Sequence, residues 1–137
     1  MPSTSGFSHV ALSVTDLDRS LAWYGRVLGA RPLMTFEHDG FRRTVMGLEG
    51  GALLGLTQHD ATGDDDAFSP SRVGLDHVGL AVDDVASLEE WVAHLDGLGV
   101  DHGGIQRDPE LGSALVAAHD PDGIQVEWYL QEHQPVP

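Results

Sequence analysis

Two histidines and one glutamate have the types and the spacing to bind a metal ion. Residues 9–16 read HVALSVTD and residues 77–84 read HVGLAVDD, so His9 and His77 open two segments that are identical at five of eight positions. Glu127 is the one charged residue in the run VEWYL, where an unpaired buried carboxylate is costly. Two imidazoles and a carboxylate form a facial ligand set that leaves positions open for water or substrate. We therefore predict that His9, His77 and Glu127 bind a metal, with Glu127 also a candidate proton acceptor.

Other residues are candidates for contact with a substrate. Tyr129 follows Glu127 by two positions, so we expect it to face the same way, as a catalytic donor or a rim aromatic. Arg42 and Arg43 are adjacent on a predicted strand, so one must point to each face, and the one in the site could hold a carboxylate or enolate oxygen. His59 is either a further metal ligand or the first exposed residue of a linker. Trp128 is predicted, together with Arg42 and Arg43, to contact the substrate. The other histidines are predicted to be solvated: His38, His94, His102, His119 and His133.

The repeated segments begin with strands that run into helices. Strict alternation after each histidine predicts a half-buried strand, with Val10, Leu12 and Val14 on one face of the first. Aspartates at helix N-cap positions and glycines at the ends predict helices over about 17–28 and 85–98. The residues of these caps are Asp16, Gly29, Asp84 and Gly99, and Trp23 and Trp91 are predicted to pack against the core.

Three further strands fit after each helix. They are expected at about 31–38, 41–48 and 51–58 in the first half, and near 102–107, 113–119 and 124–130 in the second. Each half is therefore βαβββ, and the predicted fold class is α+β. The length of 137 residues favours one domain over 6–132, made of modules 6–59 and 74–132 that an acidic linker, 60–73, joins.

Composition excludes several classes of partner. The chain has 22 acidic residues against seven arginines and no lysine, for a formal net charge of −15. A nucleic-acid-binding protein needs a basic surface, and an anionic membrane would repel this chain, so neither partner is expected. No apolar run approaches a membrane span, and residues 1–7 do not resemble a signal peptide, so a cytoplasmic protein is expected. With no cysteine, any metal must take nitrogen or oxygen ligands.

The motifs HVALSVTDLDRSLAWYGRVLG, LDHVGLAVDDV and HDPDGIQVEWY resemble the vicinal oxygen chelate superfamily, over about residues 6–131. This group includes glyoxalase I, extradiol dioxygenases, methylmalonyl-CoA epimerase, fosfomycin-resistance enzymes and bleomycin-resistance proteins. The resemblance implies two βαβββ modules that form an open, cleft-like mixed β-barrel, commonly in a homodimer. It also implies one divalent ion (Fe, Mn, Ni, Co or Zn) that stabilises an enolate or alkoxide or, as Fe(II), activates O₂.

The resemblance places metal ligands at the first strand and the last strand of each module. Those positions are His9, His77 and Glu127, while the fourth falls on Gly55, which cannot ligate. This departure disfavours glyoxalase I and the epimerase. Ala11 and Ala117 stand where fosfomycin enzymes and extradiol enzymes carry a threonine and a tyrosine.

Two functions remain open. A metal-dependent lyase, isomerase or dioxygenase would act on a small oxygenated metabolite, neutral or singly anionic because the chain is strongly acidic. The alternative is a small-molecule-sequestering protein of the bleomycin-resistance type, which Gly55 and several aromatic residues favour. These aromatics are Trp23, Phe36, Phe41, Trp128 and Tyr129.

Overall fold

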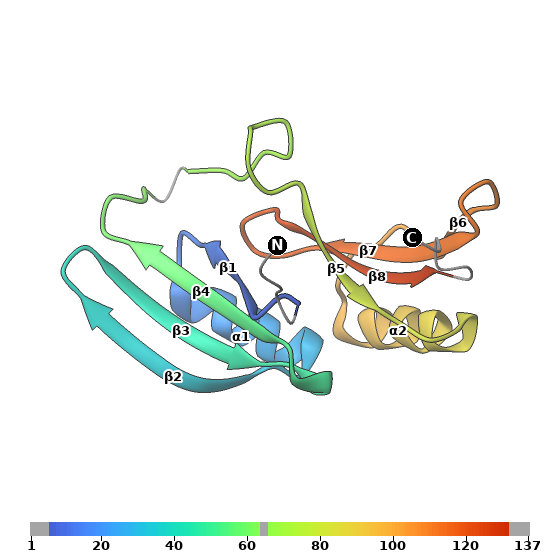
Figure 1. The fold of residues 1–137 in the computed structure, drawn as a ribbon, viewed down its shortest axis with the longest axis horizontal. Coiled ribbons are helices and arrows are strands. Elements are labelled where there is room, and N and C mark those ends of the chain that lie inside the picture. Colours follow the sequence, from blue (N-terminus) through green and yellow to red (C-terminus); the bar gives the residue numbers. More distant parts are fainter. Residues whose placement is uncertain (1–5, 64–65, 132–137) are drawn as a thin grey trace, which may run out of the picture. The chain divides into compact units, whose positions relative to one another are not determined.

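The computed structural model describes residues 6–63 and 66–131. The chain divides into two compact units, residues 1–66 and 67–137, and each holds one βαβββ module. Figure 1 shows the first unit in blue to green and the second in yellow to red. The predicted α+β class is confirmed in both.

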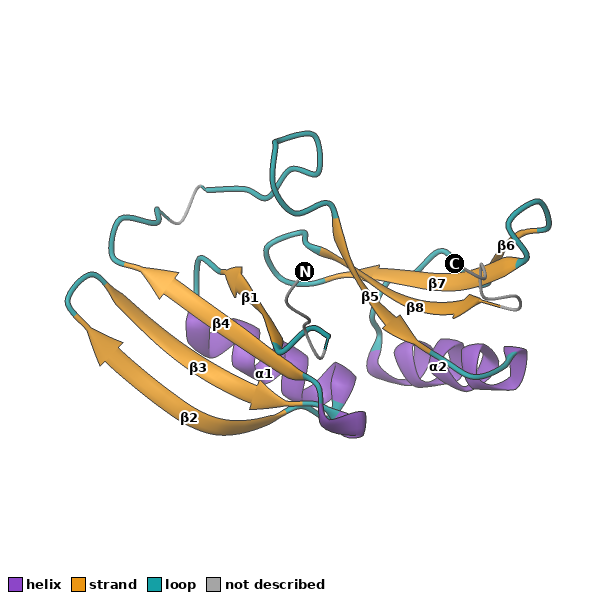
Figure 2. Cartoon of the chain, viewed as in Figure 1, coloured by secondary structure: helices purple, strands orange, loops and turns teal. Residues whose placement is uncertain are grey.

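The first unit is a four-stranded sheet with one helix. Its strands are β1 (His9–Ser13), β2 (Arg31–His38), β3 (Phe41–Gly47) and β4 (Leu53–His59), and its helix is α1 (Leu17–Leu28), with a short 3₁₀ turn at Glu49–Gly51. The sheet order is β1-β4-β3-β2, with β1 and β4 parallel and the other pairs antiparallel. The helix lies behind the sheet in Figures 1 and 2, so one face of the sheet has no helix on it.

The second unit repeats this arrangement. Its elements are β5 (His77–Ala81), α2 (Val85–Leu98), β6 (Gln106–Asp108), β7 (Ser113–His119) and β8 (Gln125–Gln131), in the sheet order β5-β8-β7-β6. The strand expected near 102–107 is reduced to β6 and an isolated bridge between His102 and Ala118.

Both helices begin and end as their sequences predict. The side chain of Asp16 accepts a hydrogen bond from the backbone N–H of Arg19, and that of Asp84 from Ser87. Gly29 and Gly99 have φ of 63° and 65°, the left-handed conformation that a side chain disfavours. The caps hold each helix directly after the first strand of its module, so that the chain returns to pair β4 with β1 and β8 with β5.

The core of each unit lies between the helix and one face of the sheet. In the first unit, Leu12, Leu54 and Met46 are almost fully buried on this side, whereas Val10 at the start of β1 is 37% exposed. In the second unit, Leu88 and Leu95 of α2 lie in the core with three residues of β8, namely Val126, Trp128 and Leu130. Side chains alternate along a strand, so the remaining residues of these strands form the opposite face. Within the described residues, no helix is long and apolar enough to cross a membrane.

Candidate metal centre and substrate face

His77 and Glu127 lie on one face of the second sheet. β5 and β8 are parallel, with His77 opposite Gln125 and Gly79 opposite Glu127, so residues 50 positions apart in the chain become neighbours. We call the face that carries His77, Gly79, Glu127 and Tyr129 the His77 face. The Nε2 atom of His77 is 3.5 Å from Oε2 of Glu127. Two ligands at about 2.0–2.2 Å from one ion in tetrahedral geometry lie about 3.3–3.6 Å apart, so these donors fit a shared metal.

The other atom of each group is held by a neighbour. Nδ1 of His77 donates to the carboxylate of Asp76 at 2.7 Å, because an ionised carboxylate only accepts, and this leaves the Nε2 lone pair directed at the Glu127 side. Nε2 of Gln125 donates to Oε1 of Glu127 at 2.6 Å. A carboxylate behind a ligating histidine fixes the orientation and raises the basicity of the ring. Glu127 is 7% exposed, and these contacts explain how its carboxylate is accommodated.

Sequence reasoning missed Asp76 and Gln125, although the repeat contained a signal for the first. Asp76 precedes His77 as Ser8 precedes His9, and Ser8 Oγ lies 3.1 Å from Nδ1 of His9. Each module therefore places a polar side chain against Nδ1 of its histidine and leaves Nε2 available.

The pKa of His77 is raised above 6.5, chiefly by the hydrogen bond to Asp76, with the charge of Glu127 acting in the same direction and partial burial acting against both. We expect Asp76→Asn to lower this pKa in the metal-free protein, as an NMR titration of the imidazole would measure. Because the folded pKa is the higher one, protonation of His77 stabilises the fold below the unfolded value near 6.5. That stability is lost as the pH rises through the raised pKa. The stability difference between the two proteins should follow the same pH range, and an unchanged pKa would contradict this role of Asp76.

Within the described ranges 6–63 and 66–131, no group of three His, Asp or Glu side chains is placed to hold a metal. His77 and Glu127 would by themselves supply two ligands, fewer than the three protein ligands that the sequence predicts. The third predicted ligand, His9, is exposed at the start of β1 in the first unit.

His9 lies on the face of the first sheet that is opposite the helix. The register places Ala11 beside Gly55, Ser13 beside Thr57 and Thr57 beside Arg43. We call this the His9 face, with His9, Ala11, Gly55, Thr57 and Arg43 as its reference residues.

Arg42 and Arg43 point to opposite faces. Arg42 is on the helix side, where it contacts Asp18 at 3.2 Å and Glu37 at 3.7 Å, and it is not part of the His9 face. Arg43 is on the His9 face, where its Nε donates to Oγ1 of Thr57 at 2.7 Å. Only Arg43 therefore shares a face with a predicted metal ligand.

The equivalence of Gly55 and Glu127 follows from register. Gly55 pairs with Ala11, two residues after His9, as Glu127 pairs with Gly79, two residues after His77. A Cβ atom at position 55 would lie 3.1 Å from Cβ of Ala11, whereas Glu127 has a glycine opposite it. In the first unit the glycine of this pair therefore lies on β4, the last strand of its module. In the second unit it lies on β5, the strand that begins with His77.

This crowding predicts a coupled pair of substitutions. We expect Gly55→Ala to destabilise the protein by about 1 kcal/mol or more through overpacking, and Ala11→Gly to relieve part of that cost in the double variant. Urea unfolding of the two single variants and the double variant would give a favourable coupling energy of at least about 0.5 kcal/mol. Additive effects would show that strands β1 and β4 tolerate a second methyl group here.

The remaining candidates lie in three places. Tyr129 is on the His77 face, but its hydroxyl donates to Gln131, on the side away from Glu127. His59 ends β4 on the His9 face, six residues beyond the position opposite His9, or about 20 Å along the strand. Trp128 is 1% exposed on the helix side of its sheet and stacks on Trp91, so it does not reach the His77 face.

Five histidines outside the candidate site are predicted to be solvated, and among those that the structure describes His102 is instead largely buried. Its side chain is 10% exposed, pairs with Asp96 at 3.1 Å and accepts a hydrogen bond from the backbone of Gly104 at Nδ1. His38, His94 and His119 are exposed, and His133 is outside the described residues.

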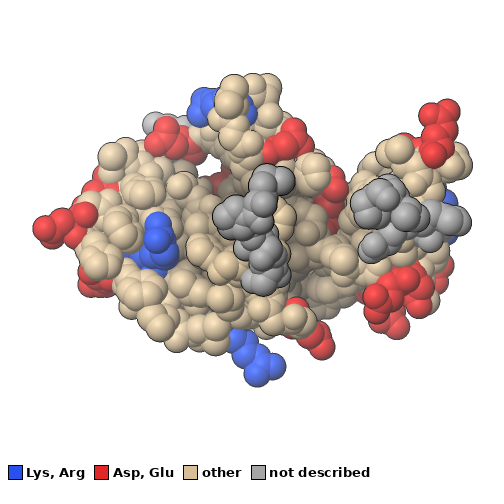
Figure 3. All heavy atoms as spheres, in the orientation of Figure 1, with Lys and Arg blue, Asp and Glu red and all other residues tan. Residues whose placement is uncertain are grey.

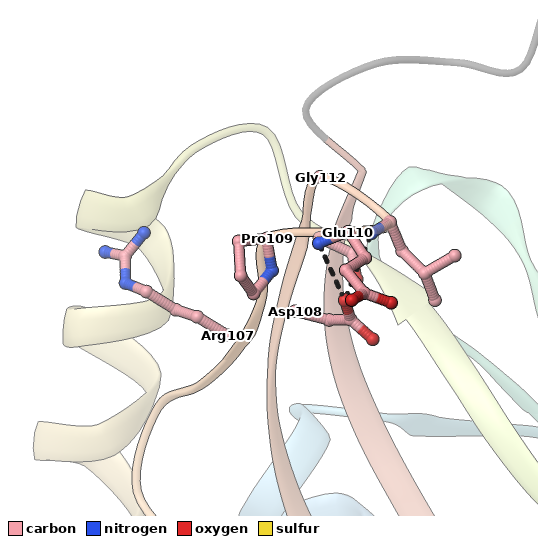
Figure 4. A pocket seen from close by; sticks show the side chains of 7 residues that line it. Arg107, Asp108, Pro109, Glu110 and Gly112 are labelled. Atoms are coloured by element: carbon pink, nitrogen blue, oxygen red, sulfur yellow. Dashed lines mark hydrogen bonds between the residues drawn. The ribbon is translucent and has the colours of Figure 1, made fainter.

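A separate pocket of about 450 Å³ lies at the β6–β7 hairpin, lined by residues 107–113. In Figure 4 Arg107 extends away from Asp108 and Glu110, and the Asp108 carboxylate accepts from the backbone N–H groups of Glu110 and Leu111. Ser113 of this pocket pairs with Gln131, six residues along β8 from the position opposite His77. At about 20 Å along the strand, the pocket is not part of the His77–Glu127 pair.

The family model, a curated relative and a solved structure all point to the same family. The model of the Glyoxalase/Bleomycin resistance protein/Dioxygenase superfamily matches residues 6–128. The chain is 33% identical over 129 residues to lactoylglutathione lyase from Haemophilus influenzae, with 88% of each covered. It is also similar to a crystal structure of a glyoxylase/bleomycin resistance protein/dioxygenase domain from Frankia sp. EAN1pec, at a TM-score of 0.87 and 32% identity, with 96% of each chain covered.

A more distant structure shares the fold alone. This is the fosfomycin resistance protein FosX from Listeria monocytogenes, a complex with Mn(II) and sulfate, at a TM-score of 0.67 and 17% identity, covering 93% of each chain. The model match spans nearly the whole described chain, and the fold agrees in both modules. The chain belongs to the Glyoxalase/Bleomycin resistance protein/Dioxygenase superfamily.

Proposed function

We propose that this protein is a metal-dependent enzyme in which His9, His77 and Glu127 bind one divalent ion. The observation that carries the proposal is the His77–Glu127 pair, with donor atoms 3.5 Å apart and each group oriented by its own neighbour. Such orientation by hydrogen-bonded neighbours is expected of metal ligands. His9 supplies the third ligand, from the same chain or from a second copy.

The substrate is a small oxygenated metabolite, neutral or singly anionic, that chelates the ion through two adjacent oxygens. A bound ion would supply Lewis-acid stabilisation of the negative charge that develops on a substrate oxygen. Glu127 presents Oε2 toward His77 and is the proposed proton acceptor, while Gln125 keeps Oε1 in place. The reaction is of the lyase or isomerase type, and lactoylglutathione lyase is the name of one relative. Ring-cleaving oxygenation is the second chemistry that the same ligands would serve.

The proposed assembly is a homodimer. β2 is an edge strand, and its apolar side chains Leu33 and Met34 are 61% and 55% exposed. Exposed apolar groups on an edge strand favour contact with another chain. Sedimentation equilibrium should give twice the chain mass, and a monomer at micromolar concentration would contradict the dimer.

Metal content tests the proposed function. Protein purified from medium supplemented with Mn, Fe, Ni, Co and Zn should carry about one equivalent of a divalent metal by elemental analysis. Metal-free protein should gain thermal stability on adding that metal, because a ligand that binds only the folded state raises the melting temperature. Protein that holds no metal and gains no stability from any of the five would contradict an enzyme of this kind. The sequestering protein would then be the function to test.

A further inference from the structure

An aromatic patch extends along the His9 face of the first sheet. Four rings follow one another, with centroids 6.4 Å apart for Phe36 and His38, 5.2 Å for His38 and Phe41, and 5.8 Å for Phe41 and His59. The register accounts for this, because His38, Phe41 and His59 are direct partners across β2, β3 and β4. Phe36 is 36% exposed, so the chain of rings is open to a ligand.

Arg43 lies within this patch and is held in place. Its guanidinium is 5.0 Å from the centroid of Phe41, and its Nε is bonded to Thr57. No carboxylate of the described part of the chain pairs with Arg43, whereas Arg42 on the other face contacts two. The terminal N–H groups of Arg43 thus remain able to bind an external carboxylate in a bidentate manner.

Charge limits what this arginine can bind. The chain has a formal net charge of −15, and Figure 3 shows the visible side of the first unit as mainly uncharged, with acidic side chains toward its margins. One guanidinium offsets one negative charge, while a ligand with several charges would be repelled by the acidic surroundings. The rings beside it favour a planar ligand, because aromatic pairs and guanidinium–ring pairs stack.

We propose that Phe36, Phe41 and Arg43, with the flanking rings of His38 and His59, bind an aromatic monocarboxylate. Arg43 receives the carboxylate, and the ligand ring extends the row of protein rings. Arg43 pairs with Thr57, four residues along β4 from the position opposite His9, or about 13 Å. The site is therefore separate from the proposed metal centre, and binding of this ligand needs no metal.

Benzoate is the probe, titrated into EDTA-treated protein by ligand-observed NMR. Benzoate should bind the wild type and Arg42→Gln alike, while Arg43→Gln should weaken binding about tenfold through loss of a charge-assisted pair. Cyclohexanecarboxylate has the same charge without the aromatic ring, and benzamide has the ring without the charge, so both should bind several-fold more weakly than benzoate. Circular dichroism would confirm that each variant is folded.

Several outcomes would overturn the proposal. Equal benzoate affinity in Arg43→Gln and the wild type would exclude Arg43, and equal affinity for cyclohexanecarboxylate would exclude the aromatic contact. No benzoate binding at its solubility limit would exclude the site. Failure of this inference is separable from failure of the proposed function, since metal retention is measured on the same preparations before EDTA treatment and without benzoate. Benzoate binding in a protein that never retains metal would support a sequestering protein with this ligand class.

Discussion

A His77→Ala protein is expected to fold normally and to lose its divalent metal. The imidazole is 44% exposed, so its removal should cost little burial of apolar surface. Replacing only an outer partner of a metal ligand typically weakens affinity by 10–100-fold, so loss of the ligand itself should exceed about a hundredfold. Elemental analysis after gel filtration and a competitive metal titration would measure the loss.

Glu127→Gln is the companion variant. It keeps the shape of the side chain and can still contact Gln125, but it removes the negative charge at the position of Oε2. We expect it to retain less metal than the wild type and more than His77→Ala, and to lose activity beyond what the metal loss explains if Glu127 also accepts a proton.

His94→Ala is the matched control for His77→Ala, because His94 lies on α2 and its ring packs on Trp91 rather than on the His77 face. It should retain the metal of the wild type. Unchanged metal stoichiometry in His77→Ala would show that the His77–Glu127 pair is a surface ion pair with no role in metal binding.

Trp128→Ala should destabilise the protein by about 3–5 kcal/mol. Trp128 is 1% exposed and stacks on Trp91 at a centroid separation of 4.6 Å, between the sheet and α2. Its removal would leave a large cavity in the core of the second unit, which lowers the free energy of unfolding. Urea denaturation followed by circular dichroism would measure this change.

Trp128→Phe separates packing from hydrogen bonding. Nε1 of Trp128 is buried without a partner among the described residues, so phenylalanine forfeits no hydrogen bond and should cost clearly less than alanine. The wild-type affinity for metal should persist in Trp128→Phe. A stable Trp128→Ala protein that had lost only ligand binding would instead support the substrate contact that the sequence suggested.

Local patterns in the sequence predicted the first strand and the helix of each module correctly. The alternation after His9 and His77, the aspartate caps and the terminal glycines all describe interactions within a few residues, which depend little on the rest of the chain. The strand expected near 102–107 has only three residues in the structure, β6, because a short edge strand is defined by its neighbour rather than by its own pattern.

Alternation could show that Arg42 and Arg43 point to opposite faces, but not which face the helix covers. That choice depends on the packing of α1 against Leu12, Leu54 and Met46, which are far apart in the sequence. Trp128, predicted from the sequence to contact the substrate, is buried and stacks on Trp91, a residue of a segment far away in the chain.

The residue types, the internal repeat and the local elements could be inferred from the sequence, because each depends on chemistry or on spacing along one segment. The contact between His77 and Glu127 required the parallel pairing of β5 with β8, since a shift of one residue would turn Glu127 to the helix side. The crowding of Gly55 by Ala11 depends on register in the same way. The contacts of Asp76 with His77 and of Gln125 with Glu127 join residues one and two positions apart, and they depend instead on how the side chains are oriented. Long-range register is set by the packing of the whole unit, which no single segment encodes.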